Sequence, residues 1–141
     1  MDLSKILAIS GKPGLFKMLS QTKTGFIVES LLDGKRFPVF AHERVSSLEE
    51  ISIFSTLEED IPLKDILKMI FTRTEGKAAP DPKSTQEEQK AFFVEAVPDH
   101  DQERVHASDI RKVLGWYNLL LEKGMLTFEE EEKAPEEEKK D

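Results

Sequence analysis

The apolar pattern of the chain changes near residue 58, and this change constrains the fold more than any other feature. Before it, short runs rich in aliphatic, β-branched and aromatic residues are separated by turns that contain glycine. Such runs are typical of β-strands. After it, Leu63, Ile66, Leu67 and Ile70 recur at the spacing of one face of a helix. The sequence therefore predicts an α+β protein with the strands first and the helices second.

We expect the first part, residues 1–57, to form a small antiparallel β-barrel. Its predicted strands are residues 15–20, 26–31 and 35–42, joined by turns that end at Gly25 and at Asp33-Gly34. Pro38 places the third strand at an edge, because proline has no N–H to donate to a neighbouring strand. A helical turn at 46–50 and a closing strand at 51–54 complete the predicted barrel. The helical spacing of Leu3, Ile6 and Leu7 predicts a short opening helix.

The second part, residues 58–128, is predicted to be a helical domain with three helices. The first helix ends at Gly76, and two prolines make residues 77–83 a linker. The second helix begins at Ser84 or Thr85 and ends before Pro98, and the third runs from Ser108 or Asp109 to Gly124. Residues 129–141 hold eight acidic and three basic residues and no apolar residue larger than alanine. We expect this acidic tail to be disordered.

Several classes of function are excluded or disfavoured by what the chain lacks. Without cysteine it has no disulfide, no thiolate nucleophile and no cysteine-ligated zinc. Asp99, His100, Asp101, Glu103 and His106 include metal-ligand types, but their spacing is typical of a solvated turn and helix entry. No serine or histidine lies in the sequence context of a nucleophile. We therefore expect no catalysis, no metal and no cofactor, in a cytoplasmic protein that has no membrane partner and is a monomer.

The charge of the chain is unevenly distributed. Residues 1–46 carry seven basic and four acidic residues, a net of +3, so the remaining residues carry −11 of the total of −8. Lysine and arginine near turns and strand ends are suited to phosphate contacts. The predicted nucleic-acid-binding residues are Lys12, Lys17, Lys23, Lys35, Arg36 and Arg44, with Phe16 and Phe40 to stack bases. Ordinary solubilising charge is the simpler explanation of the same lysines. The acidic tail could lie across this basic face, and its removal should then strengthen binding.

A second hypothesis concerns the third helix. Trp116 and Leu119 project away from its main apolar stripe. They either dock the helices onto the barrel or form an exposed apolar patch for a protein partner or a second copy. The alternative function is therefore a protein- or peptide-binding adaptor that uses the barrel or this helical face.

Four segments carry a resemblance to a known family: ISGKPGLFK, QTKTGFIVESL, LDGKRFPVFA and SDIRKVLGWYNLL. They resemble an uncharacterised bacterial family of unknown function with an N-terminal Tudor-like, SH3-type barrel followed by helices. The match covers nearly the whole chain apart from the acidic tail. The resemblance implies a non-enzymatic module, since Tudor-like barrels bind methylated lysine or arginine peptides and similar small barrels bind nucleic acid. A methyl-ammonium cage needs several exposed aromatic rings. The barrel region here offers only phenylalanines, so the chain departs from the methyl-ammonium readers and a methylated peptide is the less expected ligand.

Overall fold

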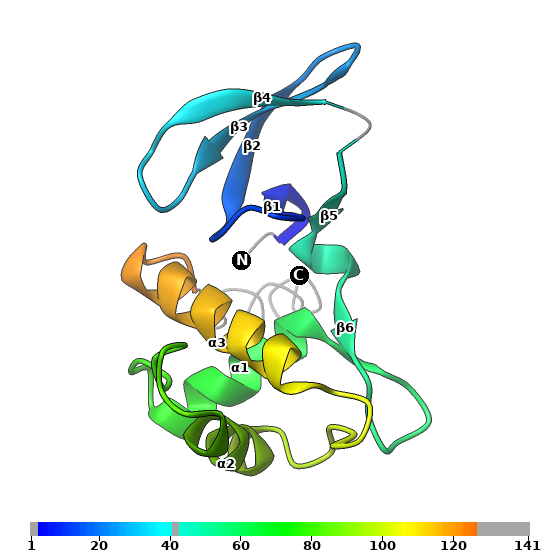
Figure 1. Cartoon of the computed structure of the whole chain (residues 1–141), viewed down its shortest axis with the longest axis vertical. Coiled ribbons are helices and arrows are strands. Elements are labelled where there is room, and N and C mark those ends of the chain that lie inside the picture. Colours follow the sequence, from blue (N-terminus) through cyan, green and yellow to red (C-terminus); the bar gives the residue numbers. More distant parts are fainter. Residues whose placement is uncertain (1–2, 41–42, 127–141) are drawn as a thin grey trace, which may run out of the picture.

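The structure, a computed structural model, describes residues 3–40 and 43–126. A sheet forms one layer and the helices form the other, with α3 lying closest to the sheet (Figure 1). The main sheet contains β1 (Ile6–Ile9), β2 (Phe16–Gln21), β3 (Gly25–Ser30), β4 (Arg36–Phe40) and β5 (Val45–Ser47). The other elements are the single turns η1 (Leu3–Lys5) and η2 (Leu48–Glu50), the strands β6 (Ser52–Ile53) and β7 (Ile61–Pro62), and the helices α1 (Leu63–Thr74), α2 (Gln86–Ala96) and α3 (Ala107–Glu122). The predicted disordered tail lies outside the described residues.

The main sheet is antiparallel and open. Its strand order is β4-β3-β2-β1-β5, and among the described residues its two edge strands, β4 and β5, do not pair with each other. The predicted closed barrel is therefore not confirmed. The sheet has an apolar cluster of its own, which consists of the buried residues Leu7, Ile9, Phe16, Val28 and Val39 and is packed by further hydrophobic residues of the strands. Pro38 lies on β4, and its predicted edge position is confirmed.

Two predicted elements of the first part are wrong. The expected opening helix is limited to the turn η1, and residues 6–9 form the strand β1 between β2 and β5. Ile6 packs in one apolar cluster and Leu7 in the other, so both faces of this strand are buried. A short continuous apolar run suits such a strand as well as it suits a helix. The expected closing strand at 51–54 is β6, which pairs with β7 instead of the main sheet.

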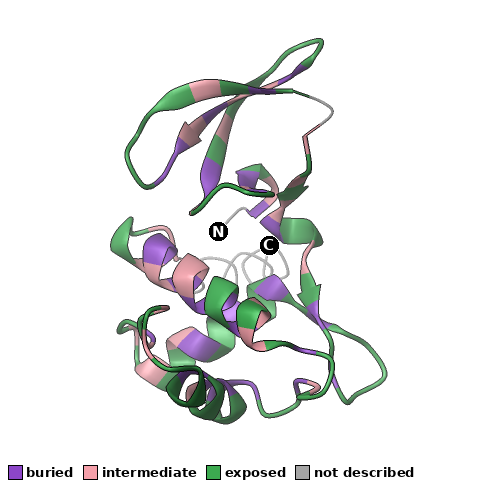
Figure 2. Ribbon diagram, viewed as in Figure 1, coloured by how far each residue is buried: buried purple, intermediate pink, exposed green. Residues whose placement is uncertain are grey.

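The three predicted helices are confirmed within the described residues. Their apolar stripes pack into one core that also contains Leu15, Leu31 and Leu48 from the first part of the chain. Buried positions occur in both layers (Figure 2). The division at residue 57 stays a prediction, and the core runs across it. None of the described helices has the length and apolar character needed to cross a bilayer.

Candidate functional site

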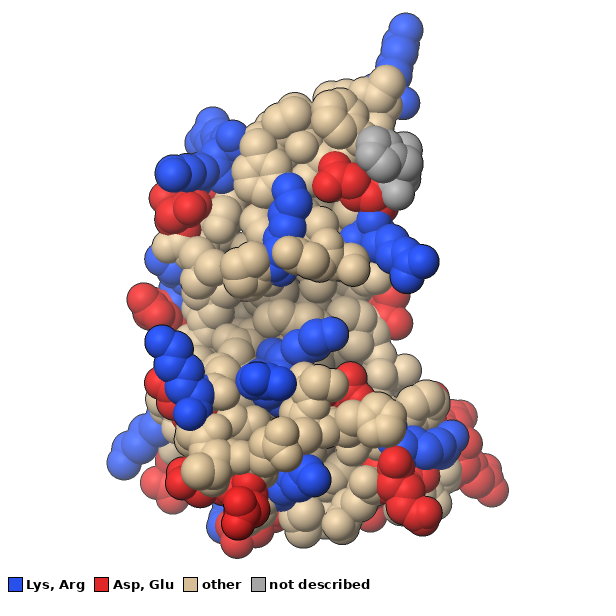
Figure 3. Space-filling view, viewed as in Figure 1, with Lys and Arg blue, Asp and Glu red and all other residues tan. Residues whose placement is uncertain are grey.

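A cleft of about 880 Å³ lies between the sheet and α3. One wall is the end of β1, the loop of residues 10–14, Arg44 and Ser46, and the other wall is α3 with Pro82 and Lys83. Figure 3 shows a hollow across the middle of this face, with basic side chains bordering it from both sides. Its volume lies within the range of about 300–1,000 Å³ that is usual for ligand sites. We call it the basic cleft.

The cleft is positively charged although the chain as a whole is acidic. The basic residues that line it are Lys12, Arg44, Lys83, Arg111 and Lys112, and the described lining residues include no Asp or Glu. All five basic side chains are exposed, whereas the total charge of the chain is −8. A hollow lined by one sign of charge concentrates its field and attracts ligands of the opposite sign. The arrangement is therefore suited to a polyanion.

Backbone geometry holds Lys12 and Arg44 in the same wall. Gly11 and Gly14 have φ of 85° and 77°, in the left-handed region that favours glycine, and they turn the loop between β1 and β2. The Ser10 N–H donates to the Arg44 carbonyl oxygen at 2.9 Å, which ties this loop to the start of β5. The Lys12 ammonium lies 4.5 Å from the centre of the Phe37 ring, within the range of a cation–π contact.

The opposite wall depends on how residues 77–85 lie along α3. The Asn118 amide accepts from the Ala79 N–H at 2.8 Å and donates to the Ala79 carbonyl at 3.1 Å. The buried Gln89 amide donates to the carbonyls of Pro82 and Ser84, both at 2.9 Å. A Cβ at Gly115 would lie 3.3 Å from Pro82 Cγ, so the absence of a side chain lets the segment approach the helix. The predicted linker is thus fixed along α3, and it places Lys83 at the cleft.

The helical spacing of α3 brings the remaining residues to the cleft. Residues 111, 112, 115, 116 and 119 line it, and residues four apart share a face of a helix. Trp116 is half-buried in the wall. Leu119 is buried in the core, with only 7% of its surface exposed. Leu119 therefore has no free surface to offer a partner and helps to join α3 to the sheet.

The other predicted nucleic-acid-binding residues lie outside the cleft. Arg36 pairs with Glu29 at 3.0 Å, and Lys17 stands opposite Glu29 on the neighbouring strand, so one carboxylate lies between two cations. Lys23 and Lys35 are exposed in connections of the sheet, and neither lines the cleft. Phe16 is buried and cannot stack a base, whereas Phe40 is exposed on β4. The structure therefore brings together Lys12 and Arg44, with Trp116 and Leu119, and leaves the others apart.

Sequence reasoning missed Lys83, Arg111 and Lys112. A signal existed for both Arg111 and Lys112. Lys112 comes four residues before Trp116, and Arg111 comes eight residues before Leu119, so each shares a helix face with a residue that the sequence had singled out. Lys83 gave no comparable signal, since its place depends on the hydrogen bonds that fix residues 77–85.

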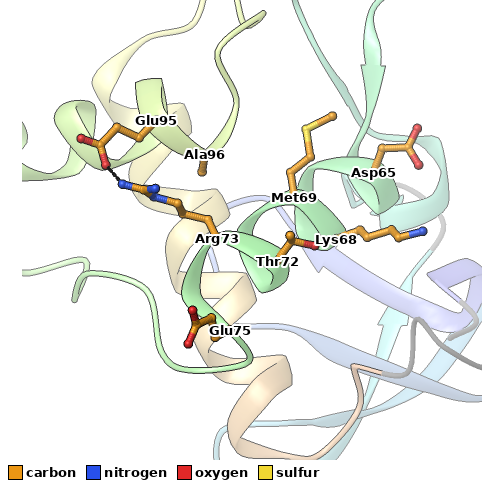
Figure 4. Close-up of a pocket in the computed structure, with 8 residues that line it drawn as sticks. All are labelled: Asp65, Lys68, Met69, Thr72, Arg73, Glu75, Glu95 and Ala96. Atoms are coloured by element: carbon orange, nitrogen blue, oxygen red, sulfur yellow. Dashed lines mark hydrogen bonds and ion pairs between the residues drawn. The ribbon is translucent and has the colours of Figure 1, made fainter.

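A second hollow, of about 670 Å³, lies between α1 and α2 (Figure 4). Its lining carries both signs of charge, and Arg73 forms an ion pair with Glu95 across it. Asp65 and Glu75 add further negative charge at its margins. Because the charges offset one another, this hollow has no comparable preference for an anion.

Two of the acidic and histidine residues near position 100, His100 and Asp101, have structural partners. The buried His100 ring packs against Phe93, and its Nδ1 lies 2.7 Å from the Val97 carbonyl oxygen. Asp101 accepts from Arg104 Nε at 2.9 Å, and this hydrogen bond lowers the pKa of the Asp101 carboxyl. Within the described residues, no group of three or more metal-ligating side chains is found.

Two family models match the chain in succession. The first, a domain of unknown function (DUF5606), matches residues 3–48, and the second, a domain of unknown function (DUF6852), matches residues 51–120. A protein from Bacteroides vulgatus with a solution NMR structure is 38% identical, and the alignment covers 90% of this chain and 91% of that one, with a TM-score of 0.73. The chain belongs to this uncharacterised family. The predicted membership of a family of unknown function is thereby confirmed, and no curated protein matches the chain.

Proposed function

We propose that this member of the family is a non-catalytic protein that binds nucleic acid in the basic cleft. One observation carries the proposal: the described lining residues include five basic side chains and no acidic one, in a chain whose net charge is −8. Phosphate groups are the anions most often bound by converging lysine and arginine side chains on nucleic-acid-binding proteins.

The composition of the cleft supports nucleic acid over a small anion. Basic side chains lie on both of its walls, Lys12 and Arg44 on the side of the sheet and Lys83, Arg111 and Lys112 on the side of α3, so several phosphates have partners. Trp116 adds an aromatic ring at the same wall, and stacking on aromatic rings is common in the binding of single strands. Binding by five phosphate contacts should give a plot of log affinity against log salt concentration with a slope of about −3.5 for a single strand.

The remaining parts of the proposal rest on the sequence. The protein acts as a monomer in the cytoplasm, without catalysis. A Tudor-like, SH3-type arrangement of the sheet is also part of the proposal. It is supported by the succession of the first four strands along the chain and by the pairing of β5 with β1.

A pair of charge-reversed variants tests the proposal. Arg111→Glu with Lys112→Glu alters the cleft, whereas Lys23→Glu with Lys35→Glu makes the same change in net charge at exposed positions away from it. Fluorescence anisotropy with a labelled oligonucleotide at two salt concentrations measures the affinity of each variant and its salt dependence. We expect the cleft variant to lose most of the affinity and about 1.4 of the salt slope, about 0.7 for each lost contact, while the control changes little.

Three results would contradict the proposal. Equal losses of affinity in the two variants would show that only the total charge of the protein matters. The absence of salt-sensitive binding would rule out nucleic acid as the ligand. An acidic peptide that binds the cleft as tightly as the oligonucleotide would instead favour recognition of a protein or peptide.

A further inference from the structure

A smaller hollow adjoins the basic cleft on the other side of Trp116. Its volume is about 220 Å³, and it shares Ile51, Lys112 and Trp116 with the cleft. The rest of its wall is mostly apolar and includes Ile53, Phe54 and Val113, with Ser52 and Asp109 as polar members. We call it the side hollow. Trp116 therefore lines both the charged basic cleft and the mostly apolar side hollow.

We propose that the side hollow receives one unstacked base of a strand whose phosphates lie in the basic cleft, so that the ligand is single-stranded. This inference rests on the proposed function and names its ligand class. The volume is below the range of about 300–1,000 Å³ that holds a whole drug-sized ligand, and it suits one planar group. In a single strand a base can leave the stack at low cost, whereas a paired base must first be flipped out of the duplex.

The residues that line the side hollow suit the flat, apolar faces of a base. Isoleucine, valine and phenylalanine side chains suit the apolar ring faces, and Trp116 offers an aromatic surface for stacking. Lys112 lies at both the cleft and the side hollow, so it can contact a phosphate next to the inserted base. The sugar-phosphate backbone of the strand would then remain in the basic cleft while the base enters the side hollow next to Trp116.

Asp109 gives the side hollow a preference among bases. Its Oδ2 accepts the His106 N–H at 3.0 Å at the start of α3, which fixes the half-buried carboxylate in place. A carboxylate has two oxygens and only accepts hydrogen bonds. Cytosine presents an amino group as a donor, whereas thymine presents a carbonyl oxygen at the same position. The side hollow therefore prefers cytosine to thymine, two bases of similar size.

The test uses the full chain and three single strands of equal length: oligo-dC, oligo-dT and a strand of abasic sugars with the same phosphates. Trp116 is the only tryptophan in the sequence, so its emission reports stacking directly. We expect oligo-dC to quench Trp116 and to bind about tenfold more tightly than the abasic strand, at the lower end of what one stacked base contributes. Oligo-dT should bind between the two.

Asp109→Asn supplies a further measurement. The amide keeps an acceptor for the His106 N–H and adds a donor, so the difference between oligo-dC and oligo-dT should disappear while the salt slope stays the same. Asp65→Asn is the matched control, because Asp65 also lies in the first turn of a helix and does not line the side hollow. It should leave the preference for oligo-dC intact.

The outcomes separate this inference from the proposed function. Equal binding of all three strands without quenching would overturn the inserted base and leave phosphate binding in place. A duplex that binds as tightly as oligo-dC would overturn the single-strand preference, and equal affinities for oligo-dC and oligo-dT would overturn the role of Asp109. Failure of every strand to bind would reject the proposed function itself.

Discussion

Trp116 and Tyr117 are neighbours in α3 with different surroundings. Trp116 is half-buried between the cleft and the side hollow, while Tyr117 is fully buried in the core. The Tyr117 hydroxyl donates to the Lys77 carbonyl oxygen at 2.9 Å and lies 2.9 Å from the Thr74 hydroxyl. Trp116 therefore lines the two hollows, whereas Tyr117 holds the segment of residues 77–85 that forms part of the cleft wall.

Replacement of the Tyr117 hydroxyl should lower stability. Tyr117→Phe leaves the Lys77 carbonyl without its donor and should reduce the free energy of unfolding by about 1–2 kcal/mol at neutral pH. Urea denaturation of the two proteins measures this difference. An unchanged midpoint and slope would contradict the role assigned to the hydroxyl.

The same residue should make stability depend on pH in the alkaline range. Burial raises the pKa of Tyr117 above its ordinary value of 10.0. Its contribution is therefore complete below pH 10 and declines as the pH rises through the folded-state pKa, because the unfolded chain loses the proton first. Tyr117 is the only tyrosine in the sequence, so its ultraviolet absorbance follows the ionisation alone. Tyr117→Phe should remove this part of the decline, and a tyrosine that ionises at its ordinary pKa would contradict it.

Elements whose structure is determined by residues close together in the sequence could be predicted, whereas elements that depend on distant contacts could not. The three helices were predictable because each carries its own apolar stripe and its own end signals, such as Thr85, whose side chain accepts from the Glu88 N–H. β1 was not, because four apolar residues fit a helix or a buried strand, and pairing with β2 and β5 decides between them. Sheet closure also depends on contacts between distant residues, so the expected barrel was not confirmed.

The candidate site was predictable only in part for the same reason. Lys12 and Arg44 could be named from the charge pattern, and Trp116 from its place outside the helix stripe. Nothing local indicated that these residues share one cleft, or that residues 77–85 would bring Lys83 to it. The signs of the charges were readable from the sequence, whereas the cleft that gathers them is a product of tertiary packing.

The 77–85 segment offers a prediction at this scale. Asn118→Ala removes both hydrogen bonds to the buried Ala79 and should reduce the free energy of unfolding by about 1–3 kcal/mol. It should also weaken oligonucleotide binding, because Lys83 loses its fixed position. Asn118→Asp is the informative companion, since it can still accept from the Ala79 N–H but cannot donate to the carbonyl. Full affinity in the destabilised Asn118→Ala protein would show that the position of Lys83 is irrelevant.

At the scale of the whole molecule, the acidic residues oppose the proposed ligand. Residues 129–141 contribute eight acidic and three basic residues, so removing them changes the net charge from −8 to −3. Less negative charge means less repulsion of a polyanion. Deletion of residues 129–141 should therefore strengthen oligonucleotide binding at low salt.

The benefit of the deletion should shrink as salt is added, because screening shortens the range of charge interactions to about 3 Å at 1 M. A chain of full length whose eight acidic and three basic tail residues are all changed to glutamine or asparagine is the control for length, because its net charge is also −3. It should behave like the deletion. A deletion that weakens binding would mean that this segment contributes to the contact instead of opposing it.

The central claim, that the basic cleft binds nucleic acid, is tested most directly by an NMR titration of isotopically labelled protein with a short single strand. We expect salt-sensitive shifts of the Trp116 indole N–H and of the Gly11, Gly14 and Gly115 amides, all of which belong to residues that line the cleft. Shifts confined to the outer face around Lys17 and Arg36, or no salt-sensitive shifts at all, would contradict the claim.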